Sequence, residues 1–431
     1  MSKAKIVLSD LHIGAGRRAE GNLLEDFTED DVLVRLIRNL IAESDTDGTE
    51  IELVLDGDIF EFWQLPALKE GTPFVPGKRY PARCYLGTSE QESRRRIWLA
   101  IDGHQELFVT LADFLCPTAP RRTITLIKGN HDIQLYWPGV QEALREALDA
   151  QGERRDCLTF EQRAISREGV YIEHGSEYAD LLNRHPNFDD PRHPRRPQRL
   201  RMVPGGPISI RLLTPLEREH YWIDGVKPFP AMLWYLLRFN RWLAVRMLFL
   251  LLPQAPRWLW VHRPFSLSKK ELAREIREIE REMREEEGTG GAPCDAKQGY
   301  PEGLLNLPSL EEMSTDEEIT EDPLLTRGLI EEHRLHARMV QVAHRKMREE
   351  RACVVIFGHT HAPCVEVLEG NGVYINTGSW TWMLDLRQEP AETWRRLIRR
   401  EQDFVSKRRL TYARIDYDGG GQPRAALYEY R

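Results

Sequence analysis

The sequence lacks two features that would assign it to a disulfide-bonded or a membrane-spanning class. Its six cysteines include no Cys-x-x-Cys pair, which suits a reducing compartment better than a disulfide framework or a zinc ribbon. Long uncharged apolar runs are also missing, because the most hydrophobic region, 229–260, is interrupted by Arg238, Arg241 and Arg246. The first residues follow a strand pattern and not that of a charged and apolar leader, so we expect a cytoplasmic protein.

A large excess of one charge is missing as well. The formal net charge is -8 and the isoelectric point is near 6.0, so the chain has no global attraction to nucleic acid. An anionic partner would have to be held by local basic patches or by metal. A hydrophobic content of 41% in 431 residues is enough for a sizeable core. We therefore expect one large domain with a substantial accessory part.

Short apolar runs rich in Val and Ile recur along the chain, and polar residues or glycine follow each of them. They predict buried strands over 5–8, 51–55, 123–128, 170–173, 353–357 and 373–375. Helical periodicity fills the intervals, for example at 32–40 and 140–148. This alternation predicts an α/β fold, in which ligands collect beyond the carboxyl ends of the strands. Five of the six runs lead into an Asp, Asn or His of the motif strings described below.

The alternation breaks down in a long insertion whose composition shifts three times. A basic, proline-rich piece is followed by a Trp-rich hydrophobic segment at 225–262. A capping box and a narrow apolar stripe then predict a charged helix at 268–288, and the acidic stretch 289–322 predicts a flexible loop. We expect 1–185 and 345–431 to form the main domain, which ends in a hairpin, and 186–344 to form a mainly helical cap.

Five short strings at the strand ends carry the chemistry. They are Asp10-Leu11-His12, Gly57-Asp58, Gly129-Asn130-His131-Asp132, His174-Gly175 and Gly358-His359-Thr360-His361. Each string alone is more often a polar exit from the core than a ligand site. Together they supply oxygen and imidazole donors suited to Mn²⁺, Fe or Zn²⁺. Residues two apart on a strand face the same way, so we expect the paired ligands to project from strand ends toward one centre.

In this order the strings resemble the five motifs of the calcineurin-like metallophosphoesterase superfamily, D-x-H, GD, GNHD, H and GHxH. The resemblance covers 1 to about 185 and 345–431, which would then be the catalytic domain. It implies a four-layer sandwich of two mixed β-sheets flanked by helices. It also implies a phosphoester hydrolase with two divalent cations, Mn²⁺ first and Fe or Zn²⁺ as alternatives, and a water or hydroxide between them as the nucleophile.

The resemblance also implies a role for each residue. Asp58 would bridge two metals about 3.5 to 4 Å apart. The remaining ligands divide into two sets, with Asp10, His12 and His361 at the first metal and Asn130, His174 and His359 at the second. His131 would stabilise charge on the phosphoryl oxygens or protonate the leaving group, with Asp132 orienting it. The alternative for His131 is a supporting hydrogen bond only.

The second motif continues as Gly57-Asp58-Ile59-Phe60-Glu61-Phe62-Trp63, which resembles the UDP-2,3-diacylglucosamine pyrophosphatase branch. That branch cleaves a pyrophosphate bond in a lipid A precursor, using Mn²⁺, and carries a helical cap at the position of this insertion. Two departures are His131, where the branch has arginine, and the greater length of the insertion. The resemblance implies a lipid-linked or nucleotide-sugar substrate, or another phosphorylated small molecule.

The segment 225–262 allows two interpretations. On a single helix, Arg238, Arg241 and Arg246 fall within an arc of about 140°, which leaves a broad apolar face for peripheral contact with the inner face of a membrane. The same face could instead dock onto the main domain as core.

Two other functions stay open. A nuclease of the same superfamily would share the metal ligands, but the Trp residues cluster with aliphatic residues and do not alternate with basic ones, so nucleic acid is not favoured. A non-catalytic scaffold would be expected to lose ligands, and none is missing from the five strings.

Overall fold

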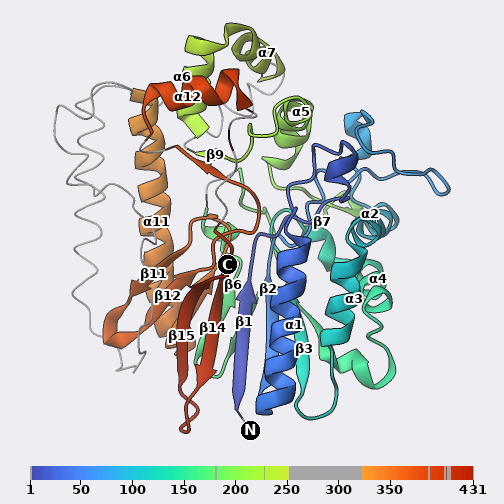
Figure 1. The fold of residues 1–431 in the computed structure, drawn as a ribbon, viewed down its shortest axis with the longest axis vertical. Helices are drawn as coiled ribbons and strands as arrows, with labels where there is room; N and C mark the ends of the chain where they lie inside the picture. Colours follow the sequence, from blue (N-terminus) through green and yellow to red (C-terminus); the bar gives the residue numbers. More distant parts are fainter. Residues whose placement is uncertain are drawn as a thin grey trace.

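Figure 1 shows the computed structural model, which describes residues 2–179, 182–227, 229–251, 323–386, 389–401, 404 and 409–430. The predicted charged helix at 268–288, the acidic segment 289–322 and the end of the Trp-rich segment, 252–262, lie outside the described residues.

The first sheet has six strands in the order β15-β14-β1-β2-β3-β4. Strands β1 to β4 are parallel, whereas the β14–β15 hairpin joins β1 in antiparallel pairing. The strand bounds are β1 (Lys3–Leu8), β2 (Glu50–Asp56), β3 (Arg122–Ile127), β4 (Leu158–Glu161), β14 (Thr411–Tyr417) and β15 (Pro423–Glu429). Strands β1, β2 and β3 are buried along most of their length, as the continuous apolar runs predict.

The second sheet has five strands in the order β11-β12-β10-β6-β5. Strands β6, β10 and β12 are parallel, and the two edge strands are antiparallel to their neighbours. The bounds are β5 (Ala164–Arg167), β6 (Val170–Glu173), β10 (Val354–Phe357), β11 (Cys364–Val367) and β12 (Val373–Asn376).

The two sheets pack face to face between outer layers of helices (Figure 1). A buried cluster of Val, Ile, Leu and Ala from both sheets fills the space between them. Helices α1 (Asp30–Asp47), α2 (Glu90–Gly103), α3 (Gln105–Phe114) and α4 (Pro138–Ala147) cover the first sheet, and α11 (Pro323–Glu350) covers the second. The predicted fold class, two mixed β-sheets flanked by helices, is confirmed.

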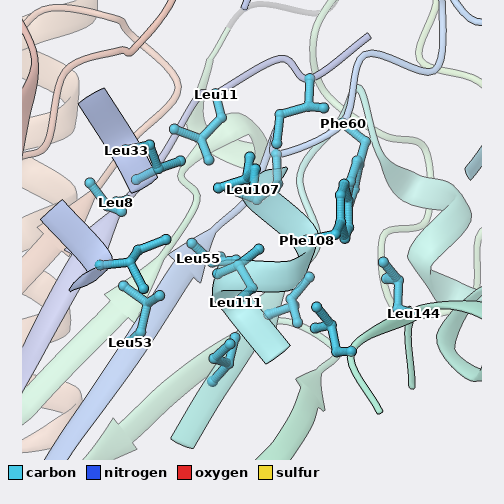
Figure 2. Close-up of a pocket in the computed structure, with 16 residues that line it drawn as sticks. Leu8, Leu11, Leu33, Leu53, Leu55, Phe60, Leu107, Phe108, Leu111 and Leu144 are labelled. Carbon is cyan, nitrogen blue, oxygen red and sulfur yellow. The ribbon is translucent and has the colours of Figure 1, made fainter. Parts of the chain in front are cut away.

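Leucine and phenylalanine side chains dominate the core between the first sheet and its helices. Figure 2 shows these side chains around an apolar cavity of about 20 Å³, to which strands, helices and the strand-end loops all contribute. The cavity is a packing gap, because it is too small for an organic ligand and its wall is hydrocarbon. Leu11, the residue between Asp10 and His12, is one of its lining residues and is 1% exposed.

A further group of helices lies beyond the carboxyl ends of the strands, at the top of Figure 1. It contains α5 (Gly206–Glu217), α6 (Phe229–Phe239), α7 (Arg241–Leu251) and α12 (Ala391–Arg399), with the short pair β9 (Val226–Lys227) and β13 (Leu384–Asp385). A separate hairpin joins β7 (Arg192–His193) to β8 (Arg196–Leu200). The helices share a core around Trp222, Leu236 and Trp394. The predicted domain boundaries stay a prediction.

Residues 229–251 form two helices, so the projection of Arg238, Arg241 and Arg246 onto a single helix does not hold across the break. The break falls at Asn240, whose side-chain oxygen accepts the backbone N–H of Leu243 (3.1 Å) and begins the second helix. The two helices bury Met232, Leu236 and Met247 against their neighbours and leave other apolar side chains exposed. Within the described residues, no helix is long and apolar enough to cross a membrane.

Candidate metal centre

The seven predicted ligands follow the carboxyl ends of five strands. Asp10 and His12 come after β1, Asp58 after β2, Asn130 after β3, His174 after β6, and His359 and His361 after β10. Strands of both sheets therefore deliver donors to the same end of the sandwich. The loop after β1 is bonded to the loop after β2, because Asp10 N donates to Gly57 O (3.1 Å) and His12 N donates to Asp58 O (2.9 Å).

Most of these residues have an unusual backbone conformation. Asp10, His12, Asp58, His359 and His361 have φ between 49° and 67°, the left-handed region that side chains other than glycine rarely adopt. Ten non-glycine residues have positive φ in the described chain, so half of them are candidate ligands. Such strain persists where the surroundings enforce it and concentrates at functional sites. The expectation that the paired ligands project by strand alternation is wrong, since both pairs lie in left-handed loops beyond the strands.

One donor group consists of Asp10, His12 and His361. His361 Nε2 lies 3.2 Å from Asp10 Oδ1 and 3.2 Å from His12 Nε2, and His12 Nε2 lies 4.0 Å from Asp10 Oδ1. Atoms bound to one ion at 2.0–2.2 Å lie about 3 to 3.5 Å apart, so these spacings suit a shared cation. Asp10 Oδ1 is buried and has no hydrogen-bond donor, which leaves it available to a metal.

The second donor group consists of Asp58, His174 and His359, with Asn130 beside it. His174 Nε2 lies 3.1 Å from Asp58 Oδ2 and 3.3 Å from Asn130 Oδ1. The other ring nitrogen of His174, Nδ1, donates to the backbone oxygen of Asp56 (3.0 Å), which leaves the lone pair on Nε2 for a metal. His359 Nδ1 is buried without a hydrogen-bond partner.

A third group, His12, Glu61 and His131, is compact enough to hold an ion but is better described as a support. Glu61 Oε2 accepts hydrogen bonds from His12 Nδ1 (2.8 Å) and His131 Nδ1 (2.6 Å). Both distances are shorter than the spacing of ligands around one metal and fit charge-assisted hydrogen bonds. Glu61 therefore fixes both rings and directs His12 Nε2 toward the first donor group.

Buried hydrogen bonds hold the ligand loops from behind. His359 N donates to Asp10 Oδ2 (2.9 Å), while Ser379 Oγ donates to the backbone oxygen of Asp10 (3.0 Å). Asn376, which is fully buried, donates from Nδ2 to Gly358 O (2.7 Å) and accepts Gly378 N–H at Oδ1 (3.0 Å). These contacts keep the loops after β1, β10 and β12 in register with one another.

Two glycines permit the close approach of the loops. A Cβ on Gly57, whose φ is +73°, would lie 2.4 Å from the ring of His174. A Cβ on Gly129 would lie 2.2 Å from Asp58 Oδ1 and 2.5 Å from Asp58 N. Any larger residue at either position would displace a candidate ligand.

The electrostatics favour the ligand forms of several donors. Burial raises the pKa of Asp10, but the neighbouring His361 outweighs it and the pKa falls to about 2. Burial and the nearby charge of His174 lower the pKa of His359 to about 3, and burial also lowers the pKa of His361. Asp10 is therefore ionised and both imidazoles are neutral at neutral pH.

Two other histidines carry a proton in the absence of a cation. Burial lowers the pKa of His12, but the hydrogen bond to Glu61 outweighs it and raises the pKa to about 9. Asp58 raises the pKa of His174 well above its usual value against the effect of burial. Metal binding at these rings must release protons, so the metal affinity depends on pH.

The residues predicted to assist catalysis lie beside this centre. The ring of His131 stacks on Trp63 with a centroid distance of 3.6 Å, and its backbone N–H donates to Asp58 Oδ1 (2.8 Å). Asp132 was predicted to orient this ring, but its carboxylate accepts the backbone N–H groups of Gly129 (2.5 Å) and Ile59 (2.8 Å). Glu61 is the ring's partner, so Asp132 fastens the loop and does not bond the imidazole.

The sequence marks Glu61 only as part of an extended motif, and Asn376 is not among the residues predicted for the site. The spacing between Asp58 and Glu61 is the pattern from which the role of Glu61 could have been predicted. No local pattern marks Asn376, because its hydrogen-bond partner Gly358 follows a different strand.

Comparison with known proteins gives no further identification, since no family model and no curated protein match the chain. The molecule is thus an α/β sandwich with buried His, Asp and Glu groups that could form a metal site.

Proposed function

We propose that this protein is a metal-dependent phosphoesterase that hydrolyses a phosphoester or pyrophosphate at a centre of two divalent cations. The observation that carries the proposal is the pair of adjacent donor groups, one built on Asp10 and one on Asp58, with the buried Asp10 Oδ1 and His359 Nδ1 left without hydrogen-bond partners. Mixed oxygen and imidazole donors favour Mn²⁺, Fe or Zn²⁺ over Mg²⁺ or Ca²⁺.

The chain's own residues would perform the remaining tasks. When bound, the cations would activate water and neutralise charge on the phosphoryl oxygens. His131 has its Nδ1 committed to Glu61, so Nε2 is the atom available to a phosphoryl or leaving-group oxygen. Glu61 would keep the ring of His131 in this orientation. The order of the five motif strings, which resembles that of calcineurin-like metallophosphoesterases, supports the same reaction class.

The decisive experiment measures metal content and hydrolysis together. Wild-type protein should take up two equivalents of Mn²⁺ and hydrolyse p-nitrophenyl phosphate or bis-p-nitrophenyl phosphate. Asp58→Asn should lose at least one equivalent and most of the activity, because its carboxylate belongs to the second donor group. Asp418→Asn, in an exposed hairpin turn, is the matched control and should behave as wild type. Full metal content and normal turnover in Asp58→Asn would contradict the proposal.

For the substrate, we propose a lipid-linked phosphoester presented at a membrane surface. Helices α6 and α7 carry strongly exposed apolar side chains, of which Trp242 is 79% and Phe249 is 72% exposed. Arg238 and Arg241 lie on the same helices, and tryptophan with arginine suits the interface of an anionic bilayer. In Figure 1 these helices lie beyond the carboxyl ends of the strands, on the same side as the candidate centre.

This surface can be tested by sedimentation with anionic liposomes. Trp242→Glu combined with Phe249→Glu should abolish co-sedimentation and leave hydrolysis of a soluble chromogenic ester near the wild-type rate. Val109→Glu, a change at a 60% exposed residue of α3, is the control and should still sediment. Retained binding by the double variant would contradict the membrane role, and rapid lipid-independent cleavage of single-stranded DNA would favour a nuclease.

A further inference from the structure

A cavity of about 340 Å³ opens directly beside the candidate metal centre. His12, His131 and His361 form its wall on the side of the centre. The opposite wall comes from α5, through Glu217, and from the turn before β9, through Asp224. Its volume is in the range of cavities that bind small organic ligands. A group attached to a phosphate at the centre would therefore extend into this space.

Four carboxyl side chains, Asp26, Glu61, Glu217 and Asp224, are among the residues that line this cavity. Asp26 accepts hydrogen bonds from Trp382 Nε1 (3.0 Å) and Gln64 Nε2 (2.8 Å), both neutral donors. Glu217, which is 4% exposed, accepts one described hydrogen bond, also from Gln64 Nε2 (3.2 Å). Asp224 Oδ1 is buried and has no hydrogen-bond partner. Buried acceptors that lack donors are costly to retain unless a ligand supplies the donors.

Without a ligand these carboxyl groups favour the neutral form, so a ligand that supplies donors would stabilise the ionised, accepting form. Burial raises the pKa of Asp26 to about 6 and raises the pKa of Glu217 and Asp224 well above the usual values. Asp26 and Asp224 add to the shift of the Glu217 pKa, and Asp26 adds to that of the Asp224 pKa. Lys227 also lines the cavity, and its ammonium donates to the backbone oxygen of Thr360 (2.7 Å).

A metal ion does not fit this cluster. Among the described residues, three groups bring their ligand atoms within 4.8 Å of one another, and none of them contains Asp26, Glu217 or Asp224. The oxygens are therefore too widely spread to surround one cation. Such a spread suits a larger organic group that presents several N–H or O–H donors at different points.

We propose that this cavity selects phosphoesters whose organic group is rich in hydrogen-bond donors, either hydroxyls or an ammonium, with Glu217 and Asp224 as the specificity-determining acceptors. The assignment rests on the proposed function, since the centre next to the cavity is taken to hold the phosphate. An apolar chain of the same length would leave the carboxylates without donors and would bind more weakly.

The test compares three phosphonates that differ only in the organic group: propylphosphonate, 2,3-dihydroxypropylphosphonate and 3-aminopropylphosphonate. They resist hydrolysis, so calorimetric titration of the Mn²⁺-loaded protein measures binding separately from turnover. Wild-type protein should bind the diol, the amine or both roughly tenfold or more tightly than the propyl compound, the factor expected for hydrogen bonds to carboxylates. Equal affinities for all three would overturn the proposal.

Variants then assign the effect to the carboxylates. Glu217→Leu should remove the tenfold preference. Glu217→Gln should retain a preference for the diol and lose one for the amine, because an amide oxygen still accepts from a hydroxyl but no longer pairs with an ammonium. If Glu217→Leu does not fold, Asp224→Leu, which also removes an acceptor, provides the same test.

Glu219→Gln is the matched control. Its carboxylate lies just beyond α5 and pairs with Arg79 and Arg246, so the preference should persist there. A preference that survives in both Glu217→Leu and Asp224→Leu would refute the assignment even if the protein hydrolyses phosphoesters. A wild-type protein that hydrolyses none but keeps the preference would refute the proposed function alone.

Discussion

Replacing Glu61 by glutamine tests whether the third donor group supports the metal centre. In the native structure Glu61 Oε2 accepts from the rings of His12 and His131, and Oε1 accepts the backbone N–H of Trp63 (2.9 Å). Glutamine has the same size but offers one oxygen and one NH₂ group. If the amide oxygen of the glutamine faces the two rings, its NH₂ group faces the Trp63 N–H, and two donors then meet without an acceptor. With the amide reversed, the NH₂ group faces both imidazoles.

The reversed amide has a direct consequence for metal binding. Nδ1 of His12 could then only accept, so its proton would move to Nε2, the nitrogen that faces Asp10 and His361. A protonated Nε2 cannot bind a metal. Either arrangement therefore loses at least one charge-assisted hydrogen bond, which contributes about 1.5 to 3 kcal/mol. That range corresponds to a loss of metal affinity of roughly 10- to 100-fold, the size typical of changes behind a metal ligand.

The assay is competition of Mn²⁺ between the protein and a chelating dye, with kcat on a chromogenic ester measured at saturating metal. Glu61→Gln should weaken metal binding and also lower kcat at full occupancy, because His131 loses its partner. Glu366→Gln is a matched control, since Glu366 accepts from His336 (3.2 Å) on another part of the surface. Wild-type affinity together with wild-type kcat in Glu61→Gln would refute the reasoning.

Three further predictions concern metal and stability. Gly129→Ala should weaken metal binding roughly 10- to 100-fold in the same competition assay, because its Cβ would clash with Asp58, whereas Gly419→Ala, where a Cβ meets nothing within 4 Å, should not. Removal of metal by EDTA should lower the free energy of unfolding, as measured by denaturant titration. The loss should be about 2.7 kcal/mol for each site when the free metal concentration before removal is a hundred times the dissociation constant of that site. Burial lowers the pKa of His104, but Asp30 and Glu25 outweigh it and raise the pKa to about 10, so its stabilisation is complete below pH 6.5 and disappears as the pH rises through 10. Between these two pH values, the free energy of unfolding of the wild type should therefore fall with pH more steeply than that of His104→Gln. The difference in slope should be about 1.4 kcal/mol per pH unit.

The positions of the strands could be predicted from sequence because the information is local. The runs 5–8, 51–55 and 123–128 became β1, β2 and β3 with ends that differ by at most two residues. Continuous apolar runs identify strands that are buried on both faces. Polar residues at their carboxyl ends then identify the edge where a site forms.

The geometry of the loops could not be predicted in the same way. Strand alternation predicts that the side chains of Asp10 and His12 project in the same direction. Both residues instead lie beyond the strand, in left-handed conformations. Tertiary contacts impose that backbone, including the hydrogen bonds from the loops after β10 and β12. No propensity of Asp or His encodes it. The break at Asn240, by contrast, had a local signal, because asparagine is a strong helix N-cap.

The carboxylates of the cavity were beyond the reach of sequence analysis for a different reason. Asp26 precedes α1, Glu217 ends α5 and Asp224 precedes β9, and nothing in their neighbours marks any of them. They become informative only when the fold brings them to one cavity and leaves Asp224 Oδ1 without a donor. A buried acceptor without a donor is a property of three-dimensional packing.

The strained loops depend on the apolar core behind them for their stability. A left-handed non-glycine residue costs about 1 to 2 kcal/mol, and five of them at one end of a sandwich would consume much of the net stability of an ordinary domain. Leu11 and Ile59, which are both 1% exposed, anchor the loops after β1 and β2 in the core shown in Figure 2. Burial of each such side chain contributes about 1.5 to 3 kcal/mol, enough to offset the strain of the ligand beside it. The residues between the ligands are therefore as necessary to the geometry of the site as the ligands themselves.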